Sequence, residues 1–304
     1  MEQSLTPGVA SDSLIYEDAA APRRRIRWLF YLWRDKKAFA GLIILVIIVF
    51  VAVFAPVITP YDPLSQEYEF LTQPSSAHIL GTDDLGRDLF TRLAYGARIS
   101  LFVGLSTVAI SLVIGVAMGL VSGFYGGWID HVIMRYIDIQ WAFPNFIIAV
   151  YLVAVFGAGL SNVIVAITLA YLDDFARVTR GVVLSIREQE FVLAGRSVGV
   201  KNGRLLLRHV LPSTIAPNIV LATIFVSQAI LAEAALSFLG LGVNPSTPTW
   251  GSILSDSRTF FSRAWWLATF PGLAIMITVL SINFLGDALR DILDVREYKE
   301  EAGH

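Results

Sequence analysis

The segment AFAGLIILVIIVFVAVFAPVI, from Ala38 to Ile58, contains no charged side chain. A helix needs about 20 mostly apolar residues to cross the hydrocarbon core of a membrane, so this segment is long enough for one span. In the whole chain of 304 residues, hydrophobic residues make up 55% and charged residues only 16%, whereas soluble domains carry about 25% charged residues. The composition therefore predicts an all-α membrane protein with much of its surface in lipid.

Further apolar segments follow the first one along the chain. The second is uncharged, and the third carries Arg135 and Asp138 near its start, three residues apart. The segment 241–263 contains Pro245 and Pro248, and we expect turns rather than another helix there. We therefore expect about six transmembrane helices, at 38–58, 99–122, 132–156, from Leu160 onward, at 212–239 and at 265–285.

Lysine and arginine are distributed unevenly between the two sides of these spans. Six spans place both chain termini on one side of the membrane, and 18 of the 23 lysines and arginines flank that side. An excess of these residues marks the cytoplasmic side of a membrane protein. We therefore expect a multi-pass membrane protein, with both termini in the cytoplasm and the segments 59–97 and 241–263 outside.

Several classes of function lack the residues that they need. The chain has no cysteine, which excludes disulfides, thiol catalysis and thiolate metal sites. None of His78, His131, His209 and His304 lies in an expected span, which argues against an intramembrane hydrolase. The sequence contains neither a His-Glu-x-x-His motif nor a Gly-x-x-x-x-Gly-Lys-Ser/Thr loop. We expect no catalytic residue, metal site or cofactor in this chain, and the net charge of −2 gives no sign of nucleic-acid binding.

Three of the acidic residues inside the expected spans are candidates for a functional site. A charge at the bilayer centre costs about 2.5–3.5 kcal/mol on insertion scales, so it needs a partner or water. Asp173 and Asp174 precede Arg177 by four and three residues, a spacing that allows ion pairs along one helix. Glu233 has no basic residue within a helical turn, and we expect it in a hydrated position. All three are either paired structurally or placed on the path or gate of a solute.

The segment 186–211 is the most informative stretch outside the spans. Phe191, Ala194 and Val198 follow the spacing i, i+3, i+7, so one face of a short helix is apolar. We expect the helix to be broken at Gly199 and a second helix to follow, which leads into the fifth span. A helix of this kind either lies on the membrane surface or binds another protein.

This segment resembles the loop motif of the inner-membrane subunits of bacterial ATP-binding-cassette (ABC) importers. The motif consists of Glu-Ala-Ala, three residues, Gly, nine residues, Ile, one residue and Leu-Pro. The matching positions here are 193–195, Gly199, His209 and 211–212, with Leu193 in place of the glutamate. The resemblance implies a coupling helix that docks in a groove of a cytoplasmic ATPase.

Three more segments resemble dipeptide and oligopeptide permeases, in the same order along the chain: 78–100, 232–251 and 284–294. The resemblance implies the transmembrane domain of a type I ABC importer, the second of two non-identical permeases, which carries peptides by alternating access. It implies a homologous permease, two ATPases that bind ATP and Mg, and an external solute-binding protein as partners. Related branches carry nickel, glutathione or oligosaccharides, and a transporter driven by an ion gradient is a further alternative.

The resemblance also implies a domain organisation and roles for single residues. We expect a tail at 1–37, the first span and an external segment at 38–97, a core at 98–290 and a tail at 291–304. Arg87 and Asp88 could contact the binding protein, or form a solvated pair in a loop. The residues expected to couple to the ATPase are Glu190, Phe191, Ala194, Gly195, Gly199 and Arg204.

Overall fold

The computed structural model describes residues 35–244 and 246–301. Helices form most of this part of the chain, which contains no strand beyond an isolated β-bridge between Thr82 and Asp88. The expected all-α membrane fold is confirmed, and most of the N-terminal tail expected at 1–37 lies outside the described residues. The main helices are α2 (Lys36–Ile58), α3 (Leu89–Tyr125), α4 (Gly127–Trp141), α5 (Asn145–Phe156), α6 (Leu160–Ile186), α7 (Glu190–Ser197), α8 (Asn202–Leu205), α9 (Leu211–Phe238), α10 (Trp250–Asp256) and α11 (Trp266–Glu301).

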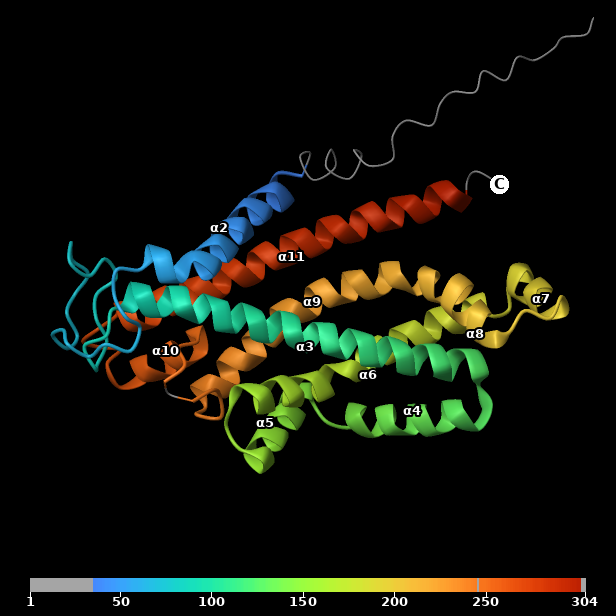
Figure 1. The fold of residues 1–304 in the computed structure, drawn as a ribbon, viewed down its shortest axis with the longest axis horizontal. Coiled ribbons are helices and arrows are strands. Elements are labelled where there is room, and N and C mark those ends of the chain that lie inside the picture. Colours follow the sequence, from blue (N-terminus) through green and yellow to red (C-terminus); the bar gives the residue numbers. More distant parts are fainter. Residues whose placement is uncertain (1–34, 245, 302–304) are drawn as a thin grey trace, which may run out of the picture.

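Figure 1 shows an elongated bundle with α3 running through its middle. The helices α6 and α9 pack against α3, and α11 packs against both α9 and α2. Residues 59–88 and α10 lie together at one end, which we call the cap. The helices α7 and α8 lie at the other end, which we call the loop end.

The described chain contains four continuous helices that are long and apolar enough to cross a membrane. They are α2, α3, the run Asn202–Phe238 that includes α9, and the first part of α11. A fifth span is formed if α4 and α5 count as one broken span. The helix α6 is long enough, at 27 residues, but its second half carries several charged side chains. It therefore depends on the helices around it to satisfy those charges.

The expected third span is not one straight helix. Helix α4 ends at Trp141, α5 begins at Asn145, and the pair is bent by 90°. Pro144 accounts for the break, because proline has no N–H to donate and disfavours a helical conformation in the residue before it. As a result α5 packs on α6, while α4 lies alongside α3 near the loop end (Figure 1).

The expectation for the segment between α9 and α11 is wrong. The segment 241–263 was expected to hold turns only, but it contains α10, whose first turn is closed by reciprocal bonds between Thr249 and Ser252. This capping box satisfies donors that would otherwise be free at the helix start. Helix α11 continues without a break to Glu301, so it extends into the segment expected as a tail from residue 291.

Close packing of α3 on α6 organises the rest of the bundle. A Cβ atom built at Gly115 would lie 2.4 Å from the carbonyl oxygen of Leu172, and one at Gly119 would lie 2.4 Å from that of Ala176. The two backbones can approach this closely only because these positions carry no side chain. The charged second half of α6 is thereby held inside the bundle.

Replacing Gly119 with alanine tests this packing directly. The new methyl group would collide with backbone rather than with a flexible side chain, so we expect Gly119→Ala to lower stability by about 1–3 kcal/mol. The measurement is the apparent melting temperature of the detergent-purified protein.

Gly181 provides a matched control on α6. A Cβ there meets nothing within 4 Å, so Gly181→Ala should leave the melting temperature unchanged or raise it, because alanine favours helices by about 1 kcal/mol over glycine. Equal effects of the two substitutions would contradict the close packing of α3 on α6.

Candidate functional site

The loop end is built as two short helices around a glycine turn. Glu190 lies in the first turn of α7 and Arg196 in the last, where the helix dipole stabilises their charges. Gly199 then adopts φ +79°, a conformation that side chains with a Cβ rarely adopt. The turn is closed by a bond from the N–H of Val200 to the carbonyl of Gly195 at 3.0 Å. The helix, glycine break and second helix expected from the sequence are confirmed.

The inner face of the loop end is fixed to the bundle by apolar contacts. Val192 of α7 and Leu205 of α8 are buried in a cluster with Phe124 of α3 and Val183 of α6. The Arg196 guanidinium lies 4.9 Å from the ring centroid of Phe124. The loop end is therefore attached to α3 and α6, and not only to the helix that follows it.

The outer face of α7 is exposed and apolar. Phe191 is 47% exposed, Leu193 is 49% exposed and Val198 is 80% exposed, and Ala194 is exposed between them. Glu190 and Arg204 are exposed as well. Gly195 does not belong to this outer face, since a Cβ there would lie 2.7 Å from Leu205 Cδ2. Its role is to let α8 pack on α7.

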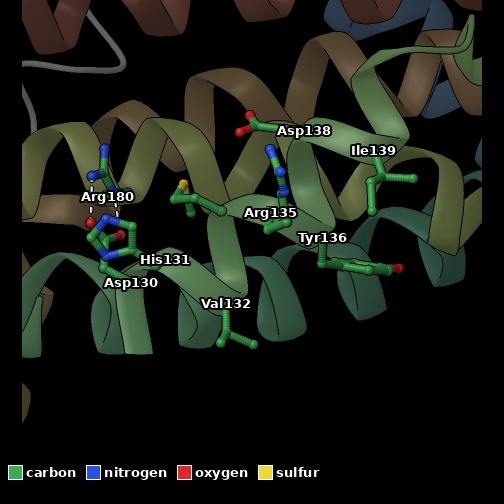
Figure 2. Close-up of a pocket in the computed structure, with 9 residues that line it drawn as sticks. Asp130, His131, Val132, Arg135, Tyr136, Asp138, Ile139 and Arg180 are labelled. Carbon is green, nitrogen blue, oxygen red and sulfur yellow. Dashed lines mark hydrogen bonds and ion pairs between the residues drawn. The ribbon is translucent and has the colours of Figure 1, made fainter. Parts of the chain in front are cut away.

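A second group of charged side chains lies where α4 meets α6. An open pocket of about 800 Å³ runs along α4, and its lining includes Asp130, Arg135, Asp138 and, from α6, Arg180 (Figure 2). Arg180 Nε and Nη2 donate to the two oxygens of Asp130, both at 2.6 Å. Figure 2 also shows that charges of both signs face this pocket.

The ion pairs expected along single helices do not form, because residues of different helices pair instead. Arg177 Nη2 donates to Asp138 Oδ1 at 3.0 Å, and its guanidinium lies 3.8 Å from the ring centroid of Trp141. Asp173 is fully buried, and neither of its oxygens accepts a hydrogen bond of ordinary geometry from the described residues. Asp174 accepts a bond from Asn145 Nδ2 at 3.4 Å.

Glu233 is buried rather than hydrated. Its carboxylate accepts bonds from Ser237 Oγ at 2.8 Å on its own helix and from Ser100 Oγ at 3.2 Å on α3. The hydroxyl of Ser100 in turn accepts the N–H of Trp250 at the start of α10, at 3.2 Å. Glu233 therefore joins α3, α9 and α10 below the cap.

Arg87 and Asp88 are buried in the cap and are not a solvated pair. Their exposed fractions are 6% and 1%. Asp88 begins α3 by accepting the N–H of Thr91 at 2.8 Å, and it lies 2.9 Å from His78 Nδ1. A direct contact with a binding protein through these two side chains does not fit this arrangement.

The cap also holds an ion-pair network that the sequence analysis missed. Asp83 accepts bonds from Arg87 Nε, at 2.7 Å, and from Arg92, while Asp256 of α10 accepts from both guanidinium groups at 3.4 and 3.1 Å. Burial raises the pKa of the neighbouring Asp84, and the charges of Asp83 and Asp256 raise it further. Only the abundance of charged residues between 83 and 92 could have indicated the network, because Asp256 is far away in sequence.

A buried amide was missed for a similar reason. Asn218 on α9 donates to Thr179 Oγ1 on α6 at 2.8 Å, and both side chains are almost fully buried. A polar residue inside an expected span was the available signal, because such residues often bond across helices in membranes.

Comparison with known proteins gives matches over most of the chain. The family described as binding-protein-dependent transport system inner membrane component matches residues 111–297, and the N-terminal transmembrane domain of oligopeptide transport permease C matches residues 25–74. A structure of the MetNI methionine ABC transporter in inward-facing conformations is similar in fold, with a TM-score of 0.53 and 19% identity over 65% of this chain and 94% of that one.

Curated relatives are similar over almost their whole length. The dipeptide permease DppC of Alkalihalophilus pseudofirmus is 46% identical over 86% of this chain and 87% of its own. The di/tripeptide permease DppC of Pseudomonas aeruginosa is 46% identical, with 86% and 88% covered. The glutathione permease GsiD of Pectobacterium atrosepticum is 40% identical, with 88% and 89% covered. The chain therefore belongs to the family of binding-protein-dependent transport system inner membrane components.

Proposed function

We propose that this chain is one permease subunit of an ABC importer that carries di- or oligopeptides across the inner membrane. The observation that carries the substrate is the 46% identity to relatives named as dipeptide and di/tripeptide permeases. Glutathione, named for a relative at 40% identity, is itself a tripeptide. Nickel and oligosaccharides are the competing substrates, and membership in a binding-protein-dependent family disfavours a transporter driven by an ion gradient.

The proposed complex contains three kinds of partner. A second, homologous permease completes the pore, two cytoplasmic ATPases bind ATP and Mg, and an external solute-binding protein delivers the peptide. This arrangement is consistent with a chain that has no nucleotide-binding Gly-x-x-x-x-Gly-Lys-Ser/Thr loop of its own. ATP hydrolysis then takes place entirely in the partner subunits.

The outer face of α7 is the proposed contact with an ATPase. An exposed apolar helix face of this kind is typical of a surface that another protein covers. Glu190, Phe191, Ala194 and Arg204 are exposed there, and Gly199 shapes the turn beside them. Because the inner face of the loop end is packed on α3 and α6, a displacement of α7 would be passed on to the transmembrane helices.

The peptide path is proposed to follow the open side of α4. Its pocket presents charges of both signs, which suits a zwitterionic peptide with an ammonium group and a carboxylate. Asp174 is half-buried beside this side of the molecule, whereas Asp173 and Glu233 are fully buried. The last two could reach a solute only after the surrounding helices move.

In this mechanism the permeases alternate between two openings. ATP binding closes the two ATPases, which displace α7 and open the pore outward to the binding protein. Hydrolysis separates the ATPases and returns the pore to its inward opening. Binding free energy at α7 drives the change, since a ligand shifts a conformational equilibrium only by its difference in affinity for the two states.

Uptake of a radiolabelled dipeptide tests the proposed substrate. Cells that express the chain with the genes of its partners should accumulate the label, and cells that lack only this chain should not. Unlabelled di- and tripeptides should compete, whereas nickel and maltotriose should not. Loss of nickel or oligosaccharide uptake, with peptide uptake intact, would contradict the substrate.

Phe191→Asp tests docking at α7. A carboxylate in the middle of an apolar contact should reduce ATPase co-purification and peptide transport by at least about tenfold, the size of a binding hot spot. The chain itself should fold, because this side chain is 47% exposed. This variant is a better test than Gly199→Trp, which would also strain the backbone at φ +79°.

The control is Ile79→Asp, which places the same charge on a residue that is 64% exposed in the cap. It should leave ATPase co-purification unchanged. If Phe191→Asp also kept its ATPase, α7 would not be the docking surface.

Single cysteines test the orientation, because the natural chain contains none. In intact cells with a permeable outer membrane, an impermeant maleimide should label Ile79→Cys but not Ser197→Cys. In inside-out vesicles only the second variant should react. The reverse pattern would place the termini outside.

A further inference from the structure

Arg177 is held by α4 although it belongs to α6. Its Nη2 donates to Asp138 Oδ1 at 3.0 Å, and its guanidinium lies 3.8 Å from the ring centroid of Trp141. Its Nε is buried without a hydrogen-bond partner among the described residues. The guanidinium therefore retains an unused donor even while it holds α4 against α6.

Asp173, one helical turn before Arg177, has hydrogen-bond acceptors without a donor. Both of its carboxylate oxygens are buried without a donor in the part of the chain that the structure describes. An acidic residue four positions before a basic one is the favourable order for an ion pair along a helix. Asp174 is already bonded to Asn145, so Asp173 is the carboxylate on α6 that lacks a partner for Arg177.

The helical geometry is interrupted at both ends of α4. Gly126 and Gly127 adopt φ +65° and +56° where α3 turns into α4, and Pro144 interrupts the helix at the other end. Between these breaks α4 is attached to α6 by polar contacts, including the Arg180–Asp130 pair and the bond from Gln140 to the carbonyl of Leu169. A polar contact can be exchanged for another more readily than an interlocked apolar one.

We propose that Arg177 is a partner-exchange switch for the position of α4. When α4 lies against α6, Arg177 is bonded to Asp138. When α4 moves away, Arg177 turns back along its own helix and pairs with Asp173. The inference rests on the proposed alternating access, for which it supplies two discrete positions of the helix beside the peptide path.

The exchange lowers the cost of releasing Arg177 from α4. The Arg177 and Asp138 side chains are 39% and 58% exposed, so water can hydrate both when α4 moves away. Asp173 is fully buried without a donor among the described residues, and a buried charge without a partner is strongly destabilising. At Arg177, the ion pair that is lost is therefore replaced by one that relieves Asp173. The carboxylate of Asp173 is then without a partner only in the state in which α4 lies against α6.

Pulsed spin-label distances in the assembled complex test the switch. The cysteine-free chain allows labels at Ile139→Cys on α4 and Gly181→Cys on α6, with Leu105→Cys and Gly181→Cys as a reference pair across α3 and α6. Without nucleotide, Asp138→Asn should shift the α4–α6 pair toward the longer distance, and Asp173→Asn toward the shorter one. Each shift should be about tenfold in the population ratio, as expected for one charge-assisted hydrogen bond.

The double variant Asp138→Asn with Asp173→Asn should return the ratio toward that of the parent, because neither state then has an ion pair. Glu188→Gln removes a carboxylate that is 77% exposed at the end of α6 and should change nothing, as should every variant at the reference pair. Shifts in the same direction for the two single variants, or no shift, would overturn the switch.

The outcome is separable from the proposed function. The nucleotide-free distances report on the switch alone, whereas peptide uptake and the response of the distances to ATP with vanadate report on transport. Opposite shifts in a complex that carries no peptide would uphold the switch and reject the substrate. Normal peptide uptake with unshifted distances would uphold the substrate and reject the switch.

Discussion

The structure depends on the close contact between α3 and α6. Helix α6 contains charged side chains at membrane depth, and without water every such group must find its partner inside the protein. Gly115 and Gly119 let α3 approach α6 backbone to backbone, while Asn218 of α9 bonds to Thr179 on α6. These contacts keep α6 within the bundle, although it is not among the four continuous helices that are long and apolar enough to cross a membrane.

The same helix connects the two ends of the molecule by different kinds of contact. At the loop end it packs on α7 and α8 through apolar side chains such as Val183 and Val192. Close-packed contacts of this kind transmit a displacement from one helix to the next. Toward α4 its contacts are ionic and can change partners. A displacement of α7 would therefore reach α6 through these contacts, and the proposed exchange of Arg177 between Asp138 and Asp173 takes place on the α4 side of the same helix.

The sequence predicted the fold class, the four continuous spans and the helix–glycine–helix of the loop end, because apolar length and local spacing determine them. It did not predict side-chain partners between distant segments. Arg177 has acidic residues at the correct helical spacing, yet it bonds to Asp138 because α4 and α6 face each other across the break at Pro144. Arg87 resembled a surface charge, and its burial depends on Asp256, which lies on another helix.

The cap differs from the α4 side in a way that has mechanical consequences. The guanidinium groups of Arg87 and Arg92 share Asp83 and Asp256, so moving α10 away would separate both of their pairs with Asp256 at once. Glu233 adds bonds among α3, α9 and α10 directly below. The cap should therefore move with α3 and α9 as one body. Relative motion within the chain is then concentrated at α4. The helical geometry is interrupted at each end of α4, and Arg177, which holds it, has Asp173 as its proposed alternative partner.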